Sequence, residues 1–161
     1  MTNLETKQQV VIYSKTTTIQ AQKGYSFEAQ QEKMKEYAEK NNLQIVKEFA
    51  DVGSDKDTKR QGFKEMLKFL EGSTDCKTIL VVKADKLCRN LKTLCELQEK
   101  YEIISACNGA NTMAHQLEVM LAEQYSKNLS EAIKAGIQKH KSKTQKKSEQ
   151  QEVVVGNNKE N

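Results

Sequence analysis

Four short apolar runs alternate with segments whose apolar residues recur at helical spacing. The runs, rich in β-branched residues, span residues 10–13, 43–49, 78–82 and 103–106. The helical patterns between them span residues 27–40, 63–70 and 87–101. Strands that alternate with helices predict an α/β fold with a parallel-dominated sheet of four to five strands, flanked by helices. Parallel connections bring the carboxyl ends of the strands to one edge, where we expect a site.

The pattern changes after residue 111. Apolar residues then recur every four positions, at Leu117, Leu121, Tyr125, Leu129, Ile133 and Ile137. This spacing predicts one long C-terminal helix with a slowly curving apolar stripe, and the chain contains no Pro to interrupt it. So small a sheet cannot bury the whole stripe. The helix therefore either lies across its own domain or projects, to dimerise or to lie along a partner.

Lysines gather towards the end of this helix. No acidic residue occurs between Glu131 and Glu149, whereas lysines recur throughout the segment. The formal net charge of +4 is too small to identify a partner, so the placement of the charge matters more. Such a segment is either a solvated tail or a phosphate-contacting arm, because clustered lysines release counterions from nucleic acid. The predicted DNA-binding residues are Lys134, Lys139, Lys141 and Lys143.

Several classes of protein are disfavoured by what the sequence lacks. The four cysteines form no CxxC pair, and with the two histidines they give no zinc-site spacing. Residues 1–9 are polar, unlike a secretory signal, and no apolar run approaches the length of a membrane span. Neither GxGxxG nor GxxxxGKS occurs, which disfavours a nucleotide-binding domain. We expect a cytoplasmic protein without metal or membrane partner.

Polar motifs follow three of the predicted strands. The first is YSKTTT at residues 13–18, with Gln20, Gly24 and Gln30 beyond it. The second is DVGS at residues 51–54, followed by RQGF at residues 60–63. The third is KADKLCRN at residues 83–90. In this order, they resemble the catalytic domain of the serine recombinases, the resolvase and invertase superfamily. LAEQYSKNLS at residues 121–130 is most similar to the large members.

The resemblance implies a resolvase-like fold and an activity on double-stranded DNA. In this family a side-chain hydroxyl attacks the scissile phosphate, the protein becomes linked to the 5′ end, and the reverse step joins a new partner. No cofactor is implied. The implied assembly is a homodimer or higher oligomer, or a hetero-oligomer with an intact recombinase. We expect a polar segment at 1–9, a catalytic domain at 10–111, a dimerisation and DNA-facing helix at 112–140, and a basic, then polar, disordered tail at 141–161.

Mapped onto this chain, the family pattern indicates nine candidate catalytic residues. Arg60, Arg89 and Asp85 match the family, and Gln20 and Ser54 fall near its polar positions. The nucleophilic serine falls on Thr17 when counted from Tyr13, or on Thr16 when counted back from Gly24. Lys15 and Lys86 stand where the family has arginines.

These departures put catalysis in doubt. The methyl group of a threonine restricts χ1 and crowds an in-line attack. A lysine keeps the charge of an arginine but loses its bidentate grip on phosphate. One lost transition-state donor typically costs about 100- to 1000-fold in rate. Two interpretations stay open: a recombinase with impaired catalysis, or a non-catalytic relative that binds DNA or other subunits. The second includes a decayed mobile-element remnant, cut short of the DNA-binding modules of larger members.

Overall fold

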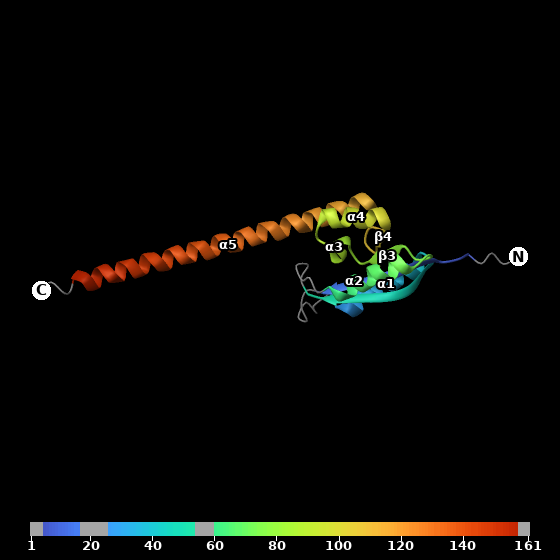
Figure 1. Cartoon of the computed structure of the whole chain (residues 1–161), viewed down its shortest axis with the longest axis horizontal. Coiled ribbons are helices and arrows are strands. Elements are labelled where there is room, and N and C mark those ends of the chain that lie inside the picture. The colour runs from blue at the N-terminus through green and yellow to red at the C-terminus, as the bar shows by residue number, and fades with distance from the viewer. Residues whose placement is uncertain (1–4, 17–25, 54–59, 158–161) are drawn as a thin grey trace. The chain divides into compact units, whose positions relative to one another are not determined.

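The structure is a computed structural model that describes residues 5–16, 26–53 and 60–157, with side chains as far as residue 148. It divides into two compact units, Met1–Glu123 and Gln124–Asn161. The elements, most of them labelled in Figure 1, are β1 (Gln8–Thr16), α1 (Phe27–Lys40), β2 (Leu43–Val52), α2 (Gln61–Gly72), β3 (Thr78–Val81), α3 (Ala84–Leu87), α4 (Leu91–Lys100), β4 (Glu102–Ser105) and α5 (Thr112–Asn157).

The first unit is built on a four-stranded sheet in the order β2-β1-β3-β4, with every neighbouring pair parallel. This confirms the predicted parallel sheet flanked by helices. Alternate residues of the strands serve opposite faces, as the pleat requires. Val11 and Ile79 belong to one core cluster, whereas Val10 and Leu80 belong to the other.

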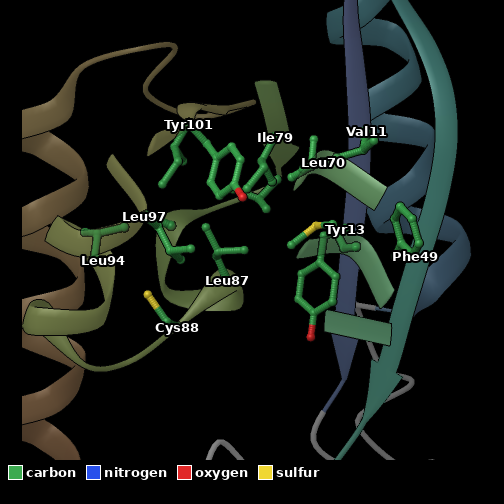
Figure 2. Close-up of a cluster of buried hydrophobic side chains, with 14 of the residues drawn as sticks. Val11, Tyr13, Phe49, Leu70, Ile79, Leu87, Cys88, Leu94, Leu97 and Tyr101 are labelled. Carbon is green, nitrogen blue, oxygen red and sulfur yellow. The ribbon is translucent and has the colours of Figure 1, made fainter. Parts of the chain in front are cut away.

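The two faces of the sheet are covered unequally. Met34 and Ala38 of α1 supply the helical side of the smaller cluster. The larger cluster takes residues from α2, α3, α4 and the first turns of α5, and Figure 2 shows Leu87, Leu94 and Leu97 gathered opposite the strands. The loops that enter these helices therefore lie on the same side of the sheet as the larger cluster.

Strand β1 is longer than the apolar run 10–13 predicted. Residues 14–16, expected to begin a loop, continue the strand because they pair with residues 50–52 of β2. The side-chain amide of Gln30 also accepts from Lys15 N (3.2 Å) and donates to Lys15 O (3.0 Å). Ser14 is therefore a buried strand residue.

The helix predicted over residues 87–101 is interrupted. The chain forms the short α3, becomes extended at Cys88, and starts again as α4. Asn90 causes the second start, because its side chain accepts a hydrogen bond from Thr93 N at 3.0 Å and so caps α4. Ser26 caps α1 through Ala29 N in the same way.

Helix α5 continues to Asn157, beyond the predicted boundary at residue 140 and through most of the segment expected to be a tail. Lysine, glutamine and glutamate, which dominate this segment, all have good helix propensity. In the first unit, α5 buries His115 and Val119, whereas Leu117 and Leu121 of the apolar stripe are exposed. In the second unit the stripe residues Tyr125, Leu129, Ile133 and Ile137 are exposed as well. Among the described residues, no helix is long and apolar enough to cross a membrane.

Candidate active site

Strand β1 extends beyond its neighbour at the carboxyl edge of the sheet. Its pairing with β3 ends at Ile12, whereas its pairing with β2 continues to Thr16. After β3 the chain turns into α3, which contacts β1. The last residues of β1 therefore lie beside the 83–90 motif instead of beside another strand. Because parallel strands deliver their loops to this edge, it is where the site was predicted.

Lys15 lies among three other cations at this edge. Its pKa is lowered to about 8, mainly by burial and then by the charges of Arg60, Arg89 and Lys86, whereas Asp51 opposes them. The residue is only 3% exposed. Arg60, Arg89 and Lys86, all predicted site residues, therefore lie close enough to Lys15 to repel its charge. Such a cluster is costly on its own and is suited to an anion that neutralises it.

Arg60 is fixed by contacts with both core and loop. One terminal nitrogen donates to Tyr13 Oη at 2.9 Å and also to the carbonyl oxygen of Leu87. The guanidinium lies 4.2 Å from the centre of the Phe63 ring, within cation–π range. Its Nε is buried and has no hydrogen-bond partner among the described residues. The arginine is thus held in place with a donor still available.

Asp51 joins β2 to the start of α2. Its two carboxylate oxygens accept from Gly62 N and Phe63 N, each at 2.8 Å, and one of them also accepts from Tyr13 Oη at 2.8 Å. A carboxylate is favourable here because helix N-termini carry unpaired N–H groups and partial positive charge. Asp51 therefore fixes the helix start that follows Arg60.

Gly62 is required by the close approach of β2. A Cβ atom at this position would lie 2.3 Å from the carbonyl oxygen of Ala50, well inside contact distance. The RQGF motif thus has a physical basis: Arg60 reaches the site, Gly62 lets the helix approach the strand, and Phe63 lies under the guanidinium.

The 83–90 motif places its charged residues through α3. Asp85 and Lys86 lie in this helix, and Arg89 follows in the turn before α4. The Oδ1 atom of Asp85 is buried and has no hydrogen-bond partner among the described residues. Lys86 and Arg89 belong to the cluster around Lys15. The motif therefore adds two cations and one carboxylate to this edge.

The candidate hydroxyls are not equally placed. Tyr13 and Val11 belong to the larger core cluster, so alternation puts Lys15 on that face and Thr16 on the face of α1. Thr16 is buried at the end of β1. Thr17, Gln20 and Ser54 lie outside the described residues. The structure thus brings together Lys15, Arg60, Lys86 and Arg89, but it does not turn Thr16 towards them.

A cysteine thiol lies near the same cations. Burial raises the pKa of Cys88 to about 11, although the neighbouring Arg60 lowers it in part. The thiol is therefore protonated at neutral pH and a poor nucleophile. Among the described residues, no three His, Cys, Asp or Glu side chains gather as metal ligands would.

Three residues that support the site were not among the predicted site residues. Tyr13 and Asp51 hold Arg60 and the start of α2, and Gln30 holds the main chain of Lys15. All three occur in the quoted motifs, which was the available signal. Their roles depend on contacts between distant segments, which spacing along the chain does not show.

The predicted DNA-binding lysines lie in the second unit. Lys134, Lys139, Lys141 and Lys143 are exposed on α5. Lys141 lies seven residues after Lys134, about two helical turns, so these two share a face, whereas Lys139 and Lys143, four residues apart, share the roughly opposite face. The lysines are spread around the helix and do not form a single row.

Comparisons with known proteins agree with this geometry. The model of the family described as "Resolvase, N terminal domain" matches residues 10–146. A resolvase family site-specific recombinase from Streptococcus pneumoniae is similar in structure, with 29% identity, a TM-score of 0.56, and coverage of 87% of this chain and 98% of that one. No curated protein matches the sequence.

Two further solved structures share the fold. The N-terminal catalytic domain of TP901-1 integrase is 24% identical, with a TM-score of 0.56 and coverage of 77% of this chain and 98% of that one. The C-terminal catalytic domain of ISC1926 TnpA, an IS607-like serine recombinase, is 23% identical, with a TM-score of 0.51 and coverage of 59% and 63%. The family match covers residues 10–146, which include Lys15, Arg60, Lys86 and Arg89. The chain therefore belongs to the resolvase N-terminal domain family.

Proposed function

We propose that the chain is a site-specific recombinase-like protein that binds double-stranded DNA, with impaired catalysis. The observation that carries the proposal is the gathering of Lys15, Arg60, Lys86 and Arg89 at the carboxyl edge of the sheet. Three cations that repel Lys15 are stabilised together with it by a phosphate diester, whose negative charge is shared by two oxygens. Family membership supports the same substrate class, because the similar S. pneumoniae protein is described as a site-specific recombinase.

The proposed reaction uses a threonine hydroxyl. Its oxygen forms a bond to the phosphorus, the bond to the 3′ oxygen breaks, and that oxygen leaves with a proton as the 3′ hydroxyl. The product is a 5′-phosphothreonine linkage, and the reverse step rejoins DNA. Thr17 is the first candidate nucleophile, because Thr16 lies on the α1 face by strand alternation. Gln20 and Ser54 are proposed as polar neighbours, and Asp85 as the carboxylate of the site.

Impaired catalysis follows from the lysines. Arg60 and Arg89 offer planar forks for phosphate oxygens, whereas Lys15 and Lys86 offer single point charges. Lys15 is also partly neutral near pH 8, because its pKa is about 8. The site should therefore bind phosphate better than it stabilises the five-coordinate transition state.

A nicked suicide substrate tests this function. Such a duplex loses the short strand after cleavage, so a covalent protein–DNA adduct accumulates and is seen by denaturing electrophoresis. We expect a slow adduct that disappears in Thr17→Ala and persists in Thr16→Ala. Lys15→Arg and Lys86→Arg should accelerate its formation, by up to about 100-fold together. DNA binding without any adduct, even in the arginine variants, would refute the catalytic proposal.

The exposed stripe of α5 favours a second candidate function, a non-catalytic partner of other recombinase subunits. Leu129, Ile133 and Ile137 are exposed in the second unit, and apolar side chains in such a row favour association. In this candidate the chain binds DNA and joins subunits but forms no adduct. It predicts a mixed oligomer with an intact recombinase by sedimentation, and a chain that stays monomeric and ignores DNA at low salt contradicts it.

We further propose a division of labour along the chain. Residues 10–111 would hold the phosphate, and the helix from residue 112 to 140 would serve subunit contact and DNA contact through Lys134 and Lys139. Residues 141–161 would extend the basic arm, and residues 1–9 have no assigned role. The assembly would be a homodimer or a higher oligomer.

A further inference from the structure

The segment that carries Asp85, Lys86 and Arg89 begins two helices in quick succession. The first, α3, starts at Ala84, and the second, α4, starts at Leu91. Each helix start presents main-chain N–H groups that have no partner within the helix. The short α3 receives no capping hydrogen bond from the side chain of Lys83 before it. Asn90 satisfies Thr93 N of α4, so the amides of Ala84 and Leu91 are the ones for which a partner from another element matters.

Two glutamates of α5 meet these helix starts. The Oε2 atom of Glu118 accepts a hydrogen bond from Ala84 N at 2.9 Å. The Oε2 atom of Glu123 accepts from Leu91 N at 3.2 Å. Both glutamates are half-buried, and they lie on either side of the buried Val119 on the face of α5 that meets the sheet domain. Residues 84–91 are therefore tied to α5 at both ends.

The charge on Glu118 is held at some cost. Burial raises its pKa, the hydrogen bond from Ala84 N lowers it in part, and the neighbouring carboxylate of Asp85 raises it again. The carboxylates of Glu118 on α5 and Asp85 on α3 repel each other, and the charge of Lys83 lowers the pKa of Glu118 only as the smallest of these effects. The hydrogen bond from Ala84 N, at the start of α3, is the contact that favours the charged form of Glu118.

We infer that Glu118 and Glu123 are positioning residues, which hold Asp85, Lys86 and Arg89 in place by anchoring residues 84–91 to the first turns of α5. The inference deepens the proposed function, because it concerns the same phosphate-binding edge. In consequence, a shift of the start of α5 would move Lys86 and Arg89 relative to Lys15, which is held by β1, and would disturb the bond from Arg60 to Leu87 O.

Amide hydrogen exchange tests the two anchors directly. Glu118→Ala should speed exchange at the amide of Ala84 by about tenfold, and Glu123→Ala should do the same at Leu91, because each amide loses its partner. Glu118→Gln keeps an acceptor oxygen and should retain the protection. Glu96→Ala, which removes an exposed carboxylate from α4, is the matched control and should change neither amide.

The pKa of Lys15 gives a second readout that loss of stability alone would not move. It is followed by NMR of the labelled lysine side chain, without DNA. Removing a carboxylate by itself would lower this pKa, because a lysine loses a favourable charge. If the double variant Glu118→Ala/Glu123→Ala releases Lys86 and Arg89, their repulsion falls and the pKa should rise from about 8. Glu118→Gln should leave the pKa unchanged or slightly lower.

The outcomes separate this inference from the proposed function. Unchanged exchange at Ala84 and Leu91 together with an unchanged or lowered Lys15 pKa in the double variant overturns the positioning role, whatever the DNA results. Faster exchange and a raised pKa support it even if no adduct ever forms. Circular dichroism shows whether the double variant folds. If it does not, Glu123→Ala alone is the test: faster exchange at Leu91 with a raised Lys15 pKa supports the inference, and unchanged exchange with an unchanged or lowered pKa overturns it.

Discussion

The ionisation of Lys15 links pH to the proposed phosphate contact. Its pKa of about 8 means that the side chain is charged at pH 7 and neutral at pH 9. DNA affinity should therefore fall between these values, and the salt dependence of log K should become shallower by about 0.9. Lys15→Arg stays charged throughout this range and should lose the pH dependence. Fluorescence anisotropy with labelled duplex at both pH values measures this, and an equal fall in both proteins would contradict it.

Gly62 should tolerate no side chain. Gly62→Ala places a Cβ 2.3 Å from the Ala50 carbonyl oxygen, and neither main-chain segment can yield easily, so we expect a loss of about 3 kcal/mol in the free energy of unfolding. Urea denaturation measures the loss. Gly72→Ala is the control, because a Cβ there meets nothing within 4 Å and should leave stability nearly unchanged. Equal midpoints for the two variants would show that the strand yields.

At the residue scale, the sequence indicated the charged residues that gather at this edge, but not the residues that hold them there. Lys15, Arg60, Lys86 and Arg89 were indicated by the resemblance of their motifs to the serine recombinases, and the structure brings the four side chains to one edge of the sheet. Glu118 was not identified, since its contact with Ala84 joins segments 34 positions apart. An isolated glutamate in a helical pattern resembles any solvated residue.

The elements were largely predictable where burial sets the pattern. Strand β3 is buried at every position, and its apolar run identified it almost to the residue. The extension of β1 was missed because Ser14, Lys15 and Thr16 are polar, and their strand pairing is fixed by β2 and Gln30. The break between α3 and α4 was missed because Leu87, Leu91 and Leu94 keep helical spacing across it.

The apolar stripe on α5 makes a prediction at this scale. If the stripe mediates self-association, then Ile133→Glu/Ile137→Glu should weaken it at least tenfold, because charges replace exposed apolar side chains. Sedimentation equilibrium measures the association constant. The control Gln138→Glu/Gln145→Glu adds the same charge at exposed polar positions of the same helix. Equal weakening by the control would indicate charge repulsion alone.

For the whole molecule, the charge on α5 should dominate the salt dependence of DNA binding. Changing Lys134, Lys139, Lys141 and Lys143 to Gln removes four contacts, so the slope of log K against log salt should become shallower by about three to four. The control changes four exposed lysines of the first unit, Lys33, Lys40, Lys68 and Lys100, with the same loss of net charge. If both sets change the slope equally, net charge governs binding and α5 is not the DNA-contacting arm.

The amide of Gln30 has a consequence for how movement travels through the domain. It occupies both main-chain groups of Lys15, as a peptide unit of a neighbouring strand would. One side chain of α1 therefore completes the sheet where β3 has already ended. Among the described residues, α1 is the helix that contributes side chains to the smaller core cluster. A displacement of α1 would therefore shift the main chain of Lys15, the most buried of the four cations. Gln30→Glu, which places a carboxylate against the Lys15 carbonyl oxygen, would remove the hydrogen bond that joins α1 to this part of β1.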